Sequence, residues 1–250
     1  MARASGAGQS RKPQRLRGKV ALITGASRGI GLAIAHALAA EGCHLAITGR
    51  SQAPLKKALR KLEKTGVRVL ARPCDVRDPG SVASLLRAVQ EEFNRLDILV
   101  NNAGVAHPNL HVDKLRFEYW SEAIDTNLTG TFLVTHYALA RMTRGGAIVN
   151  NLSTASRKAF AGSSAYVASK HGALGLTDTL REELRPRGIR VIALMPGATD
   201  TELWNTLWPQ APRRKMMSPD SVATAVVNAL ILPSDSTLEE LTIRPAAGTL

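Results

Sequence analysis

Cysteine is scarce in this sequence, since only Cys43 and Cys74 occur among 250 residues. Neither has a spacing to other ligand-type residues that is typical of a metal site, so none is predicted, and no disulfide framework is expected. A free cysteine behaves as a small apolar side chain. We therefore expect both cysteines to pack in the interior rather than to act as nucleophiles. Such low cysteine use is typical of a reducing compartment, which favours a cytoplasmic location.

Long apolar runs are missing and aromatic residues are rare. No apolar stretch approaches 18 residues, so the sequence predicts no membrane-spanning helix. Aromatic residues make up 4% of the chain, and no basic groove interleaved with them is evident, which argues against a nucleic-acid partner. With 44% hydrophobic residues, the chain is long enough to fold as one large α/β domain.

Acidic residues are absent from the start of the chain, where the first one is Glu41. The first nineteen residues contain six basic ones, Arg3, Arg11, Lys12, Arg15, Arg17 and Lys19. They account for much of the net charge of +13 and the pI near 10.4. Residues 1–17 contain no apolar core of a secretory signal and no apolar residues at helical spacing, as an organellar transit peptide requires. We expect them to form a disordered basic tail before a folded domain at 18–250.

Apolar segments typical of buried strands alternate with helical patterns along the rest of the chain. The expected strands are 19–24, 45–48, 67–71, 97–101, 147–149, 189–194 and 241–244. The expected helices are 32–39, 55–64, 81–93, 117–142 with an interruption at 127–130, a helix that carries Tyr166 and ends near 185, and 219–230. This alternation predicts an α/β fold: one doubly wound Rossmann-type domain with a seven-stranded parallel sheet flanked by helices.

A glycine-rich loop joins the first strand to the first helix. Its residues, read in order, are Gly25, Ala26, Ser27, Arg28, Gly29, Ile30 and Gly31. Glycines allow a tight turn and a close backbone approach, while the free N–H groups of a helix N-terminus favour a pyrophosphate. The spacing is GxxxGxG rather than the common GxGxxG, and a purely structural turn is the alternative.

The second strand ends at Gly49, and Arg50 follows it. In dinucleotide-binding folds a carboxylate here binds the 2′-hydroxyl of NAD, whereas a nearby arginine accommodates the 2′-phosphate of NADP. Arg50, with Arg28 of the glycine loop in reach of the same group, therefore predicts NADP(H) as cofactor. The alternative is that Arg50 is a solvated residue at a strand end.

Tyr166 and Lys170 are four residues apart, so on a helix they lie on one face, one turn apart. A nearby ammonium lowers the pKa of a phenol, which would let Tyr166 exchange protons with an alcohol or a carbonyl. Ser153 follows the strand expected at 147–149, at the edge where ligands of open α/β sheets bind. A half-buried tyrosine beside a solvated lysine is the alternative, because this pattern alone is weak.

Four motifs in the same order resemble the short-chain dehydrogenase/reductase family, in particular its NADP-preferring members. They are TGASRGIG at 24–31, NNAG at 101–104, Ser153 with Tyr166 and Lys170, and Pro196-Gly197. The resemblance covers residues 18–245. It implies that Asp75 and Val76 line the adenine, and that Asn102, Ala103 and Gly104 pass under the adenosine side. It also implies that Asn127 sits at a helix kink and holds a water linked to the catalytic lysine, and that Pro196, Gly197, Thr199 and Thr201 contact the nicotinamide and the phosphates.

The predicted activity is hydride transfer between NADP(H) and a carbonyl or secondary alcohol, with Tyr166 as general acid/base. Ser153 would orient the substrate oxygen, and Lys170 would lower the pKa of Tyr166 and hold the nicotinamide ribose. Residues 202–217, with Trp204, Leu207 and Trp208, predict an apolar substrate lid, although simple packing of the tryptophans is the alternative. His107 and His111 lie in a loop near this pocket and are expected at the surface.

Several functions are compatible with these motifs. A carbonyl reductase or alcohol dehydrogenase of small molecules is favoured over a 3-oxoacyl-(acyl-carrier-protein) reductase. The reason is that residues 240–248 read ELTIRPAAG, where those relatives have an Asp-Gly-Gly turn. A cofactor sensor or a nucleic-acid-docking Rossmann protein is the alternative of another class. The resemblance also implies a homo-oligomer, a dimer or a tetramer.

Overall fold

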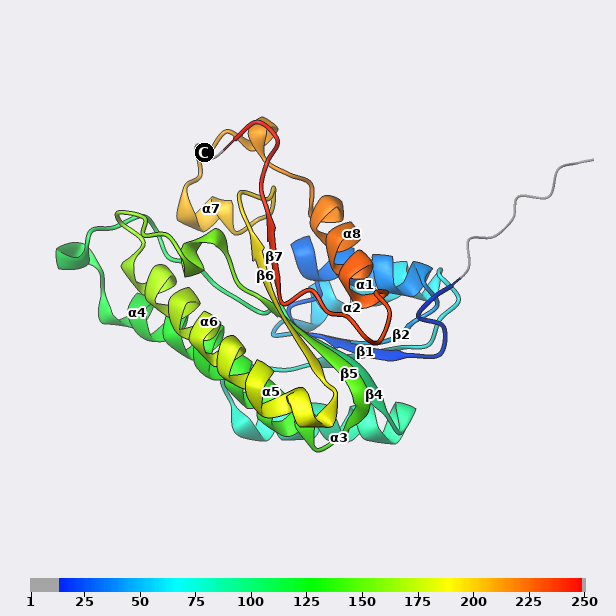
Figure 1. Ribbon diagram of the computed structural model, residues 1–250. Helices are drawn as coiled ribbons and strands as arrows, with labels where there is room; N and C mark the ends of the chain where they lie inside the picture. Colours follow the sequence, from blue (N-terminus) through cyan, green and yellow to red (C-terminus); the bar gives the residue numbers. More distant parts are fainter. Residues whose placement is uncertain (1–13, 249–250) are drawn as a thin grey trace, which may run out of the picture.

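Seven parallel strands form the central sheet of the computed structural model, which describes residues 14–248 (Figure 1). The strands are β1 (Val20–Ile23), β2 (His44–Gly49), β3 (Val69–Pro73), β4 (Leu96–Asn101), β5 (Met142–Asn151), β6 (Arg190–Pro196) and β7 (Glu240–Ile243). Their spatial order is β3-β2-β1-β4-β5-β6-β7. The order reverses between β1 and β4, which makes the carboxyl ends of these strands the expected ligand site. The predicted fold class is confirmed.

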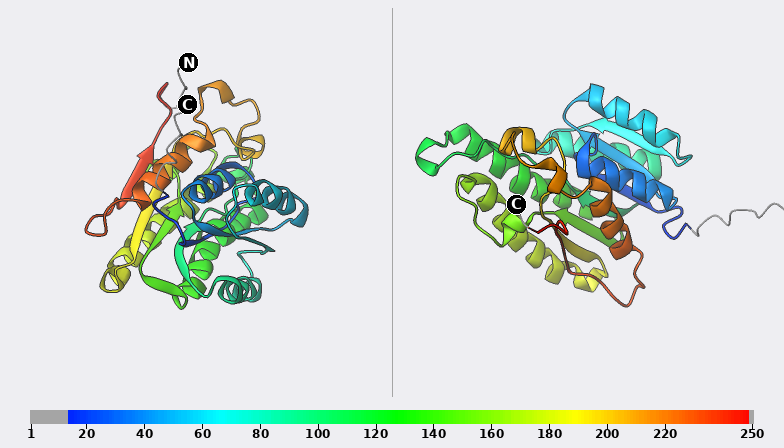
Figure 2. Two further views of the ribbon diagram at one scale, coloured as in Figure 1. Left: turned by 90° about the vertical axis from the view of Figure 1, so that its right-hand side faces the viewer. Right: turned by 90° about the horizontal axis from the view of Figure 1, so that it is seen from above.

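Helices cover both faces of the sheet. One face carries α1 (Gly29–Ala40), α2 (Gln52–Glu63) and α8 (Pro219–Leu230), and the other carries α3 (Pro79–Phe93), α5 (Gly130–Leu139) and α6 (Ser164–Leu184). The two remaining helices are shorter: α4 (Phe117–Ile124), which packs against α6, and α7 (Trp204–Leu207). Figure 2 shows the same arrangement from two other sides. No helix of residues 14–248 is long and apolar enough to cross a bilayer.

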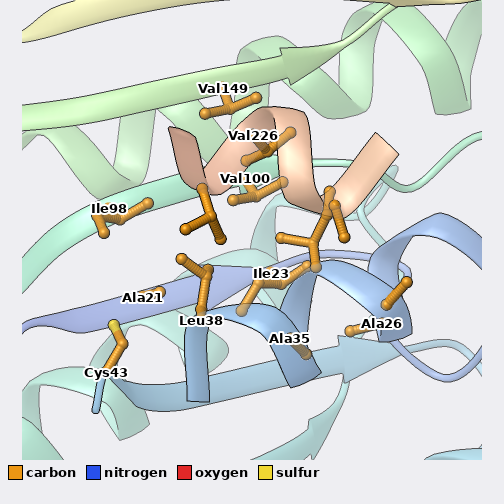
Figure 3. Packing of buried hydrophobic residues seen from close by; sticks show 14 of the residues in the cluster. Ala21, Ile23, Ala26, Ala35, Leu38, Cys43, Ile98, Val100, Val149 and Val226 are labelled. Carbon is orange, nitrogen blue, oxygen red and sulfur yellow. The ribbon is translucent and has the colours of Figure 1, made fainter. Parts of the chain in front are cut away.

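The alternation of side chains along each strand divides the core into two clusters. In β1, Ala21 and Ile23 pack toward α1 and α8, while Val20 and Leu22 belong to the cluster on the opposite face. Figure 3 shows Ala21 and Ile23 beside Leu38 of α1. Because both faces of a parallel sheet are buried, its strands read as continuous apolar runs. This explains why the strands were recognisable in the sequence.

The folded part of the chain begins earlier than predicted. Leu16 is 7% exposed and packs in the core cluster of α1. Its backbone N–H donates to the Glu41 carbonyl at 3.2 Å, and the N–H of Arg15 donates to the Glu41 carboxylate at 3.1 Å. The boundary at residue 17 was therefore wrong, because a single apolar residue among arginines gave too weak a signal. The rest of the predicted tail, residues 1–13, lies outside the described residues.

Both cysteines are free and buried, which confirms their packing role. Burial raises the pKa of the Cys43 thiol to about 12. Burial also raises the pKa of the Cys74 thiol. A buried thiol of high pKa is inert at neutral pH.

Candidate active site

A cavity of about 600 Å³ lies where the strands of the sheet end. Most of the predicted site residues line it: Gly25, Ser27, Arg28, Gly29, Ile30, Arg50, Val76, Asn102, Ala103, Gly104, Ser153, Tyr166, Lys170, Pro196, Gly197, Thr199, Thr201 and Trp204. Residues far apart in the sequence thus meet in one place. Gly31, Asp75 and Asn127 are not part of the cavity wall.

The glycine loop is held in shape by Asn102. Its amide Nδ2 donates to the carbonyl oxygens of Thr24 at 2.9 Å and Gly25 at 3.1 Å. A Cβ at Gly31 would lie 2.4 Å from that amide and 2.6 Å from the Gly25 carbonyl, so no larger residue fits there. Gly31 therefore serves close packing of the loop rather than direct contact with a ligand. Asn102 is a support for the loop as well as a residue of the cavity wall.

Thr24 ties the NNAG turn to the same loop. Its hydroxyl accepts hydrogen bonds from the backbone N–H groups of Asn102 and Ala103, both at 2.9 Å. The first turn of α1 is left without a side-chain cap at Arg28. Free N–H groups at a helix N-terminus bind anions such as phosphate. The start of α1 is thus prepared for an anionic group in the cavity.

Both arginines predicted to bind a 2′-phosphate lie at the cavity, and each is paired with a glutamate. Arg50 Nη1 lies 3.3 Å from the Glu122 carboxylate of α4, and Arg28 forms an ion pair with Glu202 of the predicted lid. All four side chains are at least 38% exposed. Exposed ion pairs of this kind are worth about 0–1 kcal/mol. A phosphate can therefore displace either glutamate at little cost.

Tyr166 and Lys170 lie on one face of α6, as their spacing predicted. The Lys170 ammonium is 5.8 Å from the centre of the Tyr166 ring. Burial raises the pKa of the Tyr166 phenol, and hydrogen bonding with Ser153 only partly offsets this effect. The expected lowering of the Tyr166 pKa by Lys170 is not seen, because desolvation outweighs the other influences on this phenol. At neutral pH the phenol is protonated and able to donate.

Lys170 is a buried cation. It is 6% exposed, and its ammonium donates to the Asn151 carbonyl at 2.8 Å. Burial lowers the pKa of Lys170 to about 8. A lysine without a carboxylate partner in such a place is costly to charge. Packing alone therefore does not favour a charged lysine here, which indicates that the charge serves the site.

Asn127 lies at the predicted interruption of the helix, in a π-helical turn over Asp125–Thr129 between α4 and α5. Its side chain accepts from the Val105 N–H at 2.8 Å and donates to the Val105 carbonyl at 3.0 Å and to Ser169 at 2.9 Å. The predicted interruption of the helix is confirmed. Asn127 connects the chain after the NNAG turn to α6, from a position behind the cavity wall.

Asp75 does not reach the cavity. Its carboxylate binds the guanidinium of Arg77 at 2.6 Å, which lowers the pKa of Asp75. Sequence reasoning placed it beside Val76 on the adenine side. Its carboxylate instead pairs with Arg77, two residues along, while Val76 remains on the cavity wall.

The predicted lid contains the short helix α7, and Trp204 is fixed there by a hydrogen bond. Its indole Nε1 donates to the Thr199 carbonyl at 2.9 Å. The guanidinium of Arg213 donates to Asp200, to the Thr201 carbonyl and to Asn205, each at 2.6 Å. These contacts hold the start of the lid against the turn after β6. Trp204, Leu207 and Trp208 all line the cavity.

His107 is the residue of this region that sequence reasoning placed wrongly. It was expected at the surface, yet it is 1% exposed. Its ring stacks against Tyr119 of α4, with centres 6.5 Å apart. No pattern in the sequence distinguishes His107 from the exposed His111. His107 is buried because its loop packs against α4 and α6, which are far apart in the sequence.

A family model described as short chain dehydrogenase matches residues 19–212. The match covers more than half of the chain and includes the glycine loop, the NNAG turn and the three catalytic candidates. The chain belongs to the short-chain dehydrogenase family. As a short-chain dehydrogenase it is an oxidoreductase that acts on CH–OH or C=O groups.

Individual short-chain dehydrogenases of known sequence are similar over most of this chain. A putative ketoacyl reductase of Streptomyces coelicolor is 40% identical over 189 residues, covering 74% of this chain and 72% of that protein. The 3-oxoacyl-(acyl-carrier-protein) reductase of Vibrio cholerae is 35% identical over 221 residues, covering 84% and 89%. Among solved structures, an alcohol dehydrogenase of Thermococcus sibiricus complexed with 5-hydroxy-NADP has a TM-score of 0.86 at 36% identity. That comparison covers 93% of this chain and 98% of the archaeal one.

Proposed function

We propose that this short-chain dehydrogenase reduces a carbonyl compound to an alcohol, or catalyses the reverse reaction, with NADP(H) as cofactor. The observation that carries the proposal is that Ser153, Tyr166 and Lys170 line the same cavity as the glycine loop and Arg28. A complete set of acid, orienting hydroxyl and cation beside a phosphate-binding helix start is what such a reaction requires. A cofactor sensor would have no use for this set.

The residues at the cavity fit a dinucleotide phosphate. The start of α1 is uncapped at Arg28, and the buried hydroxyl of Thr48, a residue of the cavity wall, has no hydrogen-bond partner among residues 14–248. Arg28 and Arg50 are the cations for a 2′-phosphate, since a guanidinium binds phosphate in two-pronged fashion. The similar alcohol dehydrogenase of Thermococcus sibiricus was solved with an NADP derivative. When bound, the nicotinamide supplies or accepts the hydride.

Tyr166 provides the proton that balances the hydride. In the reduction, the carbonyl carbon gains the hydride while its oxygen takes the proton of the Tyr166 hydroxyl. The raised pKa of Tyr166 keeps this proton in place at neutral pH. Ser153 donates a hydrogen bond to the same oxygen and orients it. Lys170 stabilises the phenolate that remains and would hold the nicotinamide ribose once the cofactor is bound, and Asn127 keeps α6 in register with the NNAG turn.

Consumption of NADPH and of NADH by the purified protein, measured with a panel of aldehydes and ketones, tests this proposal. We expect turnover with NADPH at a kcat/KM at least about tenfold above that with NADH, because one charge-assisted phosphate contact is worth about 1.5–3 kcal/mol. Equal use of the two cofactors would contradict the assignment of Arg28 and Arg50. Tight NADPH binding with no turnover on any panel member would favour the sensor function.

A second candidate substrate is a 3-oxoacyl thioester on an acidic carrier protein. Lys158 and Arg244 line the cavity, and neither has an acidic partner within residues 14–248. Such cations at a cavity can attract an anionic carrier by electrostatic steering. Turnover of the carrier-bound thioester, compared with turnover of the same acyl group on a short thiol, distinguishes the two candidates. A higher kcat/KM for the carrier-bound form that disappears in high salt would support the carrier-bound substrate.

We also propose that the protein forms a homo-oligomer through α4 and α5. Phe117 and Trp120 of α4 are 75% and 39% exposed, and Phe132 of α5 is 48% exposed. Several large exposed apolar side chains on two consecutive helices favour an interface there. The molar mass in solution, measured by light scattering for the wild type and for Phe117→Glu, tests this assignment. A wild type that is monomeric at every concentration would contradict it.

A further inference from the structure

The helix that carries both Tyr166 and Lys170 has no side-chain cap of its own. Ser163 precedes α6 without a hydrogen bond from its side chain to the first turn. The backbone N–H groups of a first turn have no partner inside the helix and need one from elsewhere. Tyr166 is the third residue of α6, so its N–H is one of these groups.

His107 supplies the missing acceptor from another part of the chain. Its Nε2 lies 3.4 Å from the backbone nitrogen of Tyr166. Its Nδ1 lies 2.7 Å from the carbonyl oxygen of Pro108, a group that can only accept. The proton of a neutral imidazole must therefore sit on Nδ1, which leaves the lone pair of Nε2 free to accept from Tyr166. One tautomer satisfies both contacts.

The loop that carries His107 is fixed at both ends. On one side, Asn127 binds both backbone groups of Val105, directly after the NNAG turn. On the other, the N–H of Leu110 donates to the Gly162 carbonyl, just before α6, at 2.9 Å. His107 sits between these two fixed points and is 1% exposed. The loop therefore joins a wall of the cofactor cavity to the start of the catalytic helix.

We infer that His107 is a positioning residue: its neutral imidazole caps α6 at Tyr166 and sets where the phenol stands relative to the NNAG turn. The inference rests on the proposed role of Tyr166 as the proton donor. A general acid has to lie within hydrogen-bond reach of the reacting oxygen, and a displacement of about 1 Å can cost about 100-fold in rate. The ring touches neither reacting atom, so its effect passes through the backbone of Tyr166.

Two variants of similar polarity test this role. In His107→Gln the amide oxygen can occupy the place of Nε2 and accept from Tyr166, whereas the shorter amide of His107→Asn reaches only the Pro108 side. We expect kcat to stay within about threefold of wild type for Gln and to fall about 10- to 100-fold for Asn, with the KM for NADPH little changed in both. His111→Asn, an exposed histidine of the same loop, is the matched control and should keep full activity.

Equal kcat values for the Gln and Asn variants would overturn the inference, as would a loss confined to NADPH affinity. A second measurement uses the wild-type protein and does not depend on any variant folding. The backbone amide of Tyr166 should exchange with solvent deuterium as slowly as amides inside α6, because it donates to His107. Rapid exchange at Tyr166 would overturn the inference. If the wild type shows slow exchange but no turnover, the proposed function fails and the capping role stands.

Discussion

The ammonium of Lys170 donates to the backbone carbonyl of Asn151 at 2.8 Å. This contact joins α6 to the carboxyl end of β5, where Ser153 follows. It is the only hydrogen bond of the Lys170 ammonium to another described residue, and the side chain is almost completely buried. The site thus holds a cation that has lost most of its hydration and has no counter-ion from the described chain. Such an arrangement lowers folding stability and is typical of functional sites.

Lys170 should make the stability of the protein depend on alkaline pH. Its pKa is lowered to about 8 in the folded protein and is about 10.4 in an unfolded chain. Below pH 8 both states are protonated and the folded state bears the full penalty of the buried charge. Between these two values the unfolded state binds more protons, so stability rises with pH. From pH 7 to pH 9.5 the wild type should gain about 2 kcal/mol in unfolding free energy relative to Lys170→Met.

Urea unfolding of the two proteins at both pH values measures this difference. Lys170→Met also loses the hydrogen bond to Asn151. This loss is the same at both pH values, so it cancels when the change in the free-energy difference with pH is taken. Lys158→Met, which removes an exposed lysine of the same cavity, is the control and should show no such gain. An unchanged difference between wild type and Lys170→Met across this range would show that Lys170 is not a desolvated cation.

Asp97 lies near the start of β4, at the end of the sheet away from the cavity. It should stabilise the fold at neutral pH, and this stabilisation should be lost in acid. Burial opposes its charge, but hydrogen bonds from Arg95 and the Val20 N–H, with the charge of Lys19, hold the pKa of Asp97 below its usual range. The stabilisation is complete above about pH 4 and is lost as pH falls through the lowered pKa. Asp97→Asn should cost about 3 kcal/mol at pH 7. In urea unfolding, the difference from wild type should shrink toward pH 3. A constant difference would contradict the ionised state.

Arg50 should determine the preference for NADPH. Arg50→Ala is expected to raise the Kd for NADPH about 10- to 100-fold and to change the Kd for NADH less than about threefold, because only NADPH carries the 2′-phosphate. Glu122 pairs with Arg50 at 3.3 Å, so Glu122→Gln should tighten NADPH binding about two- to fivefold. Fluorescence titration gives both constants, and Arg60→Ala on α2 is the control. Equal losses for both cofactors would place Arg50 outside the phosphate site.

Trp204 should contribute to substrate binding through its hydrogen bond to Thr199 as well as through the apolar surface of its ring. Trp204→Phe keeps an apolar ring but removes the donor to the Thr199 carbonyl. We expect the KM for substrate to rise about fivefold, since a lost hydrogen bond costs about 0.5–1.5 kcal/mol. Trp208→Phe, which changes the more exposed ring of the same lid, should alter KM less than twofold by the same reasoning. Equal effects of the two substitutions would mean that only the apolar surface matters.

The strands and the site motifs were predictable because their signals are local. β1 is a continuous apolar run, and the tyrosine and lysine of α6 meet because a helix brings residues four apart to one face. The interruption at Asn127 was also readable, since asparagine competes for backbone hydrogen bonds inside a helix. Helix starts were placed less well: α3 begins at Pro79 with Asp78 as its cap rather than at Ser81, although Asp-Pro is a helix-start signal.

The remaining features depend on contacts between distant parts of the chain. Leu16 is in the core because the turn after α1 lies beside it, and His107 is buried because α4 and α6 close over its loop. The direction of the Tyr166 pKa shift was also predicted wrongly: a lowered pKa was expected, and burial raises it. The spacing to Lys170 shows that a charge is near, but the balance between that charge and desolvation is decided by how deeply α6 is packed.

The most direct test of the account is single-turnover reduction of the best carbonyl substrate by Tyr166→Phe loaded with NADPH. The substitution removes the proton donor and keeps the ring, so NADPH should bind with a Kd within about threefold of wild type while the rate of hydride transfer falls about 100-fold or more. Tyr137→Phe, on α5 and away from the cavity wall, is the control and should react at the wild-type rate. Hydride transfer by Tyr166→Phe at a rate close to that of wild type would contradict the role of Tyr166 as the acid.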